Sequence, residues 1–266
     1  MKKVIVTPAG RERYLQTLVK YIKREVGTFD EWHLWLNTNI QSDIDYCRQL
    51  EQTYSWIKVI TIPTVNEVLL TNIYKFFKYA QDIDSVYIRL DDDIVYLEPG
   101  FFDKLFKKRL ENPEPFLVYP NIINNAIISH IHQRNNLFNC EKIGYGCMDK
   151  NGWENPSVAE TIHRSFINDV KTNNIDKWKK SFNVWDLYDY ERVSINCISW
   201  FGSEFAKFNG EVGTDEEDWL STKKPSFIKK PNIIVNEPIC VHFSFFTQRK
   251  HLDSTDILNQ YDSLSN

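Results

Sequence analysis

The sequence lacks the features that mark several large classes of protein. No apolar run among its 266 residues approaches the roughly 20 residues that a membrane-spanning helix needs. It has no basic excess: its net charge is -4 and its pI about 5.9, whereas nucleic-acid-binding domains are usually basic. The N-terminus runs directly into a strand-like segment and has no signal-peptide core. We therefore expect a cytoplasmic protein with no membrane span and no nucleic-acid partner.

Cysteines and several catalytic signatures are also scarce. The five cysteines are odd in number and form no CxxC pair. Reduced structural thiols are therefore expected rather than disulfides or a zinc site. The sequence contains no Walker A loop, no GxGxxG and no GxSxG, which argues against P-loop, Rossmann-dinucleotide and serine-hydrolase assignments.

What the sequence does contain is an alternation of short apolar segments and helical patterns over the first 120 residues, which is typical of a doubly wound α/β unit. Strands are expected at residues 4–6, 32–36, 57–62, 85–97 and 116–119, and helices at 11–24, 42–52, 65–80 and from 99 onward. The Asn-rich residues 121–190 carry one clear helix at 156–170 and are predicted to form an insertion or second lobe. A strand near 239–243 and a polar helix are predicted to end the chain.

The most informative segment is the apolar run that ends in Asp91, Asp92 and Asp93. Acids at the carboxyl end of a buried strand lie where an α/β sheet opens into its binding crevice. Their mutual repulsion would be offset by Mg²⁺ or Mn²⁺, which combine carboxylates with substrate phosphates. On an extended backbone, Asp91 and Asp93 would point to one side and Asp92 to the other. The segment predicts a metal–diphosphate site, and the alternative is a solvated acidic turn.

A second acidic motif comprises the four adjacent acids of residues 215–218. Full ionisation of all four is unfavourable, so at least one pKa should be raised. A carboxylate with a raised pKa suits a general base that takes a proton from a sugar hydroxyl. The alternative is the capped start of an exposed helix, where acids are favoured.

Four further features each allow two interpretations. His242 is either a packed core residue or a metal ligand, and Arg249 either meets a diphosphate or belongs to a solvated face. The Lys/Pro-rich residues 223–231 form either a lid over a diphosphate or a plain linker. Trp200 and Phe201 are either core residues or a platform on which a sugar stacks.

The strand followed by "RLDDD" resembles the DxD region of glycosyltransferases with the GT-A fold. The first strand, which runs into Thr7 and Pro8 with Arg11 just beyond, looks like the nucleotide-binding entry of that family. "RLDDD" followed much later by "DEEDWL" is similar to bacterial rhamnosyltransferase-like and related viral glycosyltransferases. The resemblance covers most of the chain in the order of its elements, but only three short motifs are sharp.

The resemblance implies a single α/β domain of GT-A type over residues 1–266, with a Rossmann-like mixed central sheet flanked by helices. Residues 1–120 would bind the nucleotide sugar, and residues 121–266 would bind the acceptor and include the C-terminal helix. It implies Mn²⁺ or Mg²⁺ held by Asp91, Asp93 and His242. Donor contacts are expected from Thr7, Pro8, Arg11, Arg89, Asp91 and Asp92.

The family's acidic pair followed by an aromatic residue matches Glu217, Asp218 and Trp219. The resemblance therefore makes Asp218 the first choice for the catalytic base and Glu217 the second, with Asp215 and Glu216 left to hold the acceptor.

The expected function is a metal-dependent, inverting glycosyltransferase that moves a sugar from a nucleoside-diphosphate sugar to a hydroxyl of a glycan or glycoconjugate. One alternative is a sugar-phosphate nucleotidyltransferase, although its Gly-rich signature after the first strand is reduced here to Gly10. The other is a non-catalytic carbohydrate-binding or scaffolding protein, in which the metal carboxylates and the second acidic motif would be surplus.

Overall fold

A sheet of nine strands runs through the centre of the computed structural model, which describes residues 1–62 and 72–265. The strands lie in the order β3 (Ile57–Ile60), β2 (Glu31–Leu36), β1 (Lys2–Ala9), β4 (Ser85–Leu90), β8 (Cys197–Phe201), β6 (Val118–Ile123), β9 (Asn232–His242) and β5 (Ile94–Leu97), and β7 (Val184–Leu187) pairs with β9. The β3–β2–β1–β4 part is parallel, whereas β8, β5 and β7 run antiparallel to their neighbours. This mixed sheet confirms the predicted α/β class.

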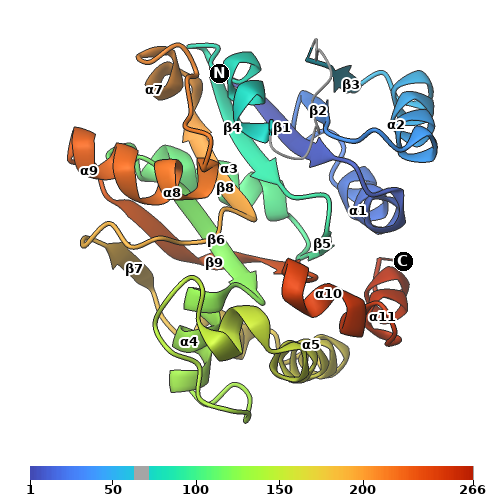
Figure 1. Ribbon diagram of the computed structural model, residues 1–266, viewed down its shortest axis with the longest axis vertical. Helices are drawn as coiled ribbons and strands as arrows, with labels where there is room; N and C mark the ends of the chain where they lie inside the picture. The colour runs from blue at the N-terminus through green and yellow to red at the C-terminus, as the bar shows by residue number, and fades with distance from the viewer. Residues whose placement is uncertain (63–71, 266) are drawn as a thin grey trace.

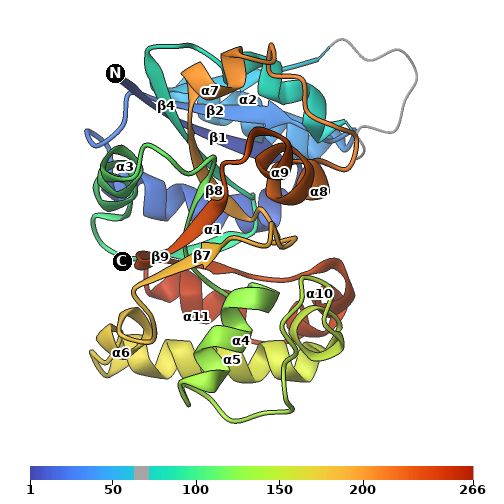
Figure 2. The same ribbon diagram turned by 90° about the vertical axis from the view of Figure 1, so that its left-hand side faces the viewer.

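Helices cover the sheet and form a further layer at one end of it (Figures 1 and 2). Those of the first half are α1 (Glu12–Arg24), α2 (Gln41–Thr53), the 3₁₀ helix η2 (Ile73–Tyr79) and α3 (Phe101–Glu111). Those that follow are α4 (Ala126–Arg134), the π-helical η3 (Lys150–Glu154), α5 (Pro156–Lys171), α6 (Asp176–Lys179), α7 (Gly202–Ala206), α8 (Glu216–Asp218), the π-helical η4 (Trp219–Lys223), α9 (Lys224–Ile228), α10 (Phe246–Leu252) and α11 (Ile257–Ser263).

The helix α1 shows how the two ends of the chain share one core. Its apolar face is buried at the 3.6-residue spacing that an amphipathic helix requires, including Leu15, Leu18 and Ile22. The hydroxyl of Tyr21 donates to the carbonyl of Tyr261 at 2.6 Å, which ties α1 to α11. One continuous cluster of buried side chains includes residues from both halves of the sequence.

Expected strands and helices with a clear hydrophobic periodicity, such as the helices at 11–24, 42–52 and 156–170, agree with the structure. Three expectations are wrong. The run at 85–97 is not one strand, because a turn at the acids divides it into β4 and β5. The expected helix at 65–80 lies partly outside the described residues, and its remainder is 3₁₀. The expected loop at 223–231 is mostly helical, in η4 and α9.

All five cysteines are free thiols. Within residues 1–62 and 72–265, no helix has the length and apolar character to cross a membrane.

A glycine at the end of β8 provides a test of the packing. A Cβ added to Gly202 would lie 2.0 Å from the backbone oxygen of Asp82, and a backbone atom cannot yield as a flexible side chain can. We expect Gly202→Ala to lower the free energy of unfolding by about 1–3 kcal/mol, as overpacking does, measured by urea denaturation. Gly146→Ala is the matched control, because nothing described lies within 4 Å of its added Cβ. Equal stability of both variants would contradict this packing.

Candidate active site

A polar cavity of about 240 Å³ opens at the carboxyl ends of β1, β2 and β4. It is lined by Pro8, Gly10, Arg11, Asn37, Ile73, Arg89, Asp91, Asp92 and Arg249. Ligands of α/β sheets commonly bind outside this edge. The volume suits a diphosphate group but not a whole nucleotide sugar, since pockets for larger ligands span about 300–1,000 Å³.

Gly10 brings the chain after β1 close to the neighbouring strand. A Cβ at this position would lie 2.8 Å from the carbonyl oxygen of Asn37, so only glycine fits the approach. The backbone N–H of Gly10 donates to Asp92 Oδ2 at 3.0 Å. This close turn therefore places the start of α1 against the aspartate triplet.

The three aspartates do not alternate as on an extended strand, because they occupy the turn between β4 and β5. The N–H of Ile94 donates to the carbonyl of Asp91 at 3.1 Å and closes this turn. Asp92 and Asp93 share one partner as a result: the guanidinium of Arg11 is hydrogen-bonded to Asp92 and lies 2.9 Å from Asp93 Oδ2. The expected pairing of Asp91 with Asp93 on one side is wrong.

Asp91 instead faces the acidic motif. Its Oδ1 lies 2.9 Å from Arg89 Nη2, and its Oδ2 accepts a hydrogen bond from the side-chain amide of Asn196 at 3.3 Å. Both oxygens of Asp91 therefore already have protein neighbours, and its expected role as a metal ligand stays a prediction. Burial raises its pKa, against the opposing charge of Arg89.

Asp93 and His242 are the pair that fits a divalent cation. Asp93 Oδ1 is buried and has no hydrogen-bond partner in the described parts of the chain, and it lies 3.7 Å from His242 Nε2. His242 Nδ1 is 3.2 Å from the carbonyl oxygen of Asn124. The tautomer that donates this bond leaves the Nε2 lone pair facing Asp93, as in many metal-bound histidines.

The charges around Asp93 keep it ionised. Burial opposes ionisation, but the neighbouring positive charges, of which that of Arg11 is the largest, outweigh it and lower the pKa of Asp93. The described residues form no group of three or more His, Cys, Asp or Glu arranged as a complete metal site. A cation held by Asp93 and His242 would therefore complete its shell with substrate phosphate and water, as Mg²⁺ commonly does.

Arg89 connects the cavity to the second acidic motif. Its buried guanidinium lies 2.9 Å from Asp91 through Nη2 and 2.9 Å from Glu216 Oε1 through Nη1. Glu216 Oε2 is buried and accepts no hydrogen bond from any described residue. Burial raises the pKa of Glu216, and the charges of Asp91 and Glu217 add to this effect against that of Arg89.

The other three acids of the motif are already paired. Asp215 is the N-cap of α8, where it accepts from the N–H of Asp218 at 3.1 Å. Arg192 clamps Asp215 through two contacts at 3.0 Å and reaches Glu217 at 2.9 Å. Asp218 lies 2.6 Å from Lys223. The expectation that one of the four acids has a raised pKa agrees with Glu216.

Asp218, the first choice from the sequence, has the opposite shift. Its hydrogen bond with Lys223 lowers its pKa, and the hydroxyl of Thr222 donates to its Oδ1 at 3.0 Å. Asp218 is therefore not the acid of the motif whose pKa is raised. Glu217, the second choice, has its Oε1 occupied by Arg192 and by the thiol of Cys147 at 3.3 Å.

Thr7 is not placed as predicted, and the structure decides between the two interpretations of Trp200. The side chain of Thr7 is buried and accepts a hydrogen bond from the indole N–H of Trp32 at 2.9 Å, so it is turned away from a ligand. Trp200 is fully buried and donates to the carbonyl of Ala80 at 3.0 Å, which makes it a core residue and not a sugar platform.

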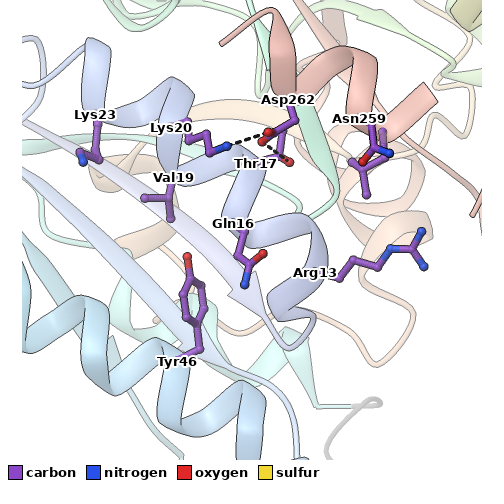
Figure 3. Close-up of a pocket in the computed structure, with 10 residues that line it drawn as sticks. Arg13, Gln16, Thr17, Val19, Lys20, Lys23, Tyr46, Asn259 and Asp262 are labelled. Atoms are coloured by element: carbon purple, nitrogen blue, oxygen red, sulfur yellow. Dashed lines mark hydrogen bonds and ion pairs between the residues drawn. The ribbon is translucent and has the colours of Figure 1, made fainter. Parts of the chain in front are cut away.

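A larger surface hollow lies elsewhere, between α1 and α11 (Figure 3). It has a volume of about 570 Å³, but two of its three basic residues, Lys20 and Arg13, are already paired. Lys20 lies 2.7 Å from Asp262, and Arg13 lies 3.2 Å from Asp253. The hollow contains none of the predicted site residues, so the smaller polar cavity is the candidate site.

Three residues of the site carried little signal in the sequence. Asn196 and Arg192 precede β8 and reach the acids only because β8 pairs with β4. Asn124 supplies the carbonyl that orients His242. For Asn196, the only indication in the sequence was its position as a polar residue directly beside an apolar strand.

Comparison with protein-family models gives no match, and comparison with curated protein sequences gives none. Among solved structures, the chain is similar to 4-diphosphocytidyl-2C-methyl-D-erythritol synthase from Anaerococcus prevotii. The sequence identity is 12%, the TM-score is 0.42, and the match covers 100% of this chain and 96% of that chain. At this distance the likeness carries no argument about activity, so the function has to be inferred from the site alone.

Proposed function

We propose that the protein is a metal-dependent, inverting glycosyltransferase that uses a nucleoside-diphosphate sugar and a hydroxyl acceptor. The observation that carries the proposal is the pair formed by Asp93 and His242 beside a cavity whose walls include Arg11 and Arg249. A carboxylate, an imidazole and two guanidinium groups at the carboxyl edge of the sheet suit a cation and a diphosphate.

Arg249 supports the placement of the diphosphate. Its Nη2 lies 3.7 Å from Asp93 Oδ2, and its Nε is buried without a hydrogen-bond partner among residues 1–62 and 72–265. A buried donor without a partner is costly, and a phosphate oxygen would satisfy it. Asp93 and His242 would hold Mn²⁺ or Mg²⁺, which when bound stabilises the charge that develops on a departing diphosphate.

Glu216 is the acid of the second motif that best suits the role of base. One of its carboxylate oxygens has no hydrogen-bond partner among the described residues, and its pKa is raised. It also lies at the start of α8 and is linked through Arg89 to Asp91. In the proposed step, Glu216 accepts the proton of the acceptor hydroxyl, and the hydroxyl oxygen bonds to the anomeric carbon. The bond from that carbon to the diphosphate oxygen breaks, and its electron pair leaves with the diphosphate.

The test is slow hydrolysis of a panel of UDP-, GDP- and dTDP-sugars with and without Mn²⁺. Metal-dependent release of nucleoside diphosphate from at least one donor is the expected result. Formation of a nucleotide sugar from sugar phosphate and nucleoside triphosphate, with pyrophosphate as co-product, would instead identify a nucleotidyltransferase. Inertness toward every donor, with saccharide binding retained, would identify a carbohydrate-binding protein.

A further inference from the structure

A partly exposed aromatic pair outside the cavity has no part in the proposed donor site. Tyr145, in the loop after α4, is 41% exposed, and Trp185 of β7 lies beside it with the ring centroids 6.1 Å apart. The Trp185 Nε1–H donates to the hydroxyl of Tyr145 at 3.0 Å. This hydrogen bond holds the two rings at a fixed tilt of 49°, so a ligand that stacks on them loses little additional conformational freedom on the protein side.

A carboxylate with one oxygen that accepts no hydrogen bond from a described residue lies next to the aromatic pair. The hydroxyl of Tyr145 donates to Glu191 Oε1 at 3.1 Å, whereas Glu191 Oε2 is buried and has no hydrogen-bond partner in the described chain. An acceptor left unpaired in this way is unfavourable, and a hydroxyl of a ligand would satisfy it. Apolar ring faces beside a hydroxyl acceptor match a saccharide, which has apolar C–H faces and hydroxyl edges.

The aromatic pair is also tied to the acidic motif from both sides. Cys147 follows Tyr145 by two residues, and its thiol lies 3.3 Å from Glu217 Oε1. Arg192 follows Glu191 directly and lies 2.9 Å from the same oxygen. Two residues of chain span at most about 7 Å, so the rings lie within a short reach of α8. Both ribbon views show the segment between β7 and β8 passing beside α8 (Figures 1 and 2).

We propose that Tyr145, Trp185 and Glu191 form an acceptor subsite for a saccharide, which rests on the glycosyltransferase function and adds the chemical class of the acceptor. One sugar ring of the acceptor stacks on the two aromatic side chains, and one of its hydroxyls donates to Glu191 Oε2. The hydroxyl that is glycosylated is then presented to Glu216 in α8. The partly buried carboxylate of Glu191 disfavours a purely apolar occupant such as an acyl chain.

The experiment measures binding of a panel of pyranosides and disaccharides by saturation-transfer NMR, in parallel with donor hydrolysis. We expect Glu191→Gln and Trp185→Ala each to weaken saccharide binding by about tenfold or more, as for a central aromatic or buried polar contact, while donor hydrolysis is unchanged. Trp185→Phe keeps a ring but loses the hydrogen bond to Tyr145, and it serves if the alanine variant does not fold. Trp56→Phe is the matched control, because Trp56 is also half-buried and lies beside β3 at the other side of the sheet.

The outcomes separate this subsite from the proposed function. Donor hydrolysis with saccharide binding that survives all three variants would overturn the subsite and leave the glycosyltransferase standing. Donor hydrolysis without any saccharide binding would also overturn it, because the acceptor would then belong to another class. Absence of donor hydrolysis would remove the proposed function, and the effect of the variants on saccharide binding would still decide the subsite.

Discussion

Replacing Asp93 by asparagine is expected to abolish Mn²⁺-dependent donor binding while the protein stays folded. Asparagine keeps the shape of the side chain but removes the charge of the one buried carboxylate that faces His242. The loss of a metal contact that stabilises diphosphate by several kcal/mol corresponds to about a thousandfold in donor turnover. Isothermal titration of Mn²⁺ with a nucleotide sugar, together with donor hydrolysis rates, would measure both effects.

The control for this variant is Asp176→Asn, a substitution at an exposed aspartate in α6 whose side chain is 70% exposed. It should bind metal and donor like the unmodified protein. Asp91→Asn tests the orientation of the triplet, because the contacts of Asp91 with Arg89 and Asn196 assign it a positioning role. Loss of metal binding in Asp91→Asn, with Asp93→Asn unaffected, would restore the ligand that the sequence indicated and refute the pairing of Asp93 with His242 as the metal site.

Replacing Glu216 by glutamine is expected to leave donor affinity unchanged and to lower the rate of sugar transfer by about 10²–10⁴-fold, the usual contribution of a general base. Glutamine preserves the size of the side chain and a contact with Arg89, but it cannot accept the proton. Because the base must be ionised, the transfer rate should rise with pH through its pKa, which burial places above the ordinary value for glutamate. This acid limb of the pH profile should disappear in the variant.

Asp218→Asn is the matched comparison, since both substitutions neutralise one acid of the same short helix. Its hydrogen bond with Lys223 lowers the pKa of Asp218, so an acid limb due to this residue would lie below the ordinary value for aspartate. We expect Asp218→Asn to retain most of the transfer activity. Loss of transfer in Asp218→Asn with retention in Glu216→Gln would return the role of base to the residue that the sequence ranked first.

The location of the site could be predicted from the sequence because its signal is local. An apolar run that ends in three aspartates indicates acids at the carboxyl edge of a sheet, and this inference does not require knowing which strands lie beside it. In the structure, Pro8, Arg11, Arg89, Asp91 and Asp92 do line one cavity. His242 could be proposed beside the triplet only through the resemblance, because the sequence around a lone histidine in an apolar strand does not show which residue it contacts.

The roles of most of the individual acids could not be predicted, because they depend on contacts between residues far apart in the chain. Whether Asp91 or Asp93 faces His242 is decided by the turn between β4 and β5, and by the antiparallel pairing that brings β9 beside β5. Among residues 215–218, the cations Arg89, Arg192 and Lys223 each engage one or two of the acids. Arg89 and Arg192 are brought to the motif by the order of strands, whereas Lys223 is only five residues further along the chain from Asp218.

The sequence by itself determined the α/β class, most of the strands, several of the longer helices, and the edge of the sheet at which charged groups gather. These properties follow from hydrophobic periodicity and from where polar residues interrupt it, both of which act over a few neighbouring residues. The tertiary structure alone decided which carboxylates remain without a partner, at Asp93 Oδ1, Glu216 Oε2 and Glu191 Oε2. A free lone pair in a buried place is a property of everything packed around it, and no short segment of sequence contains that information.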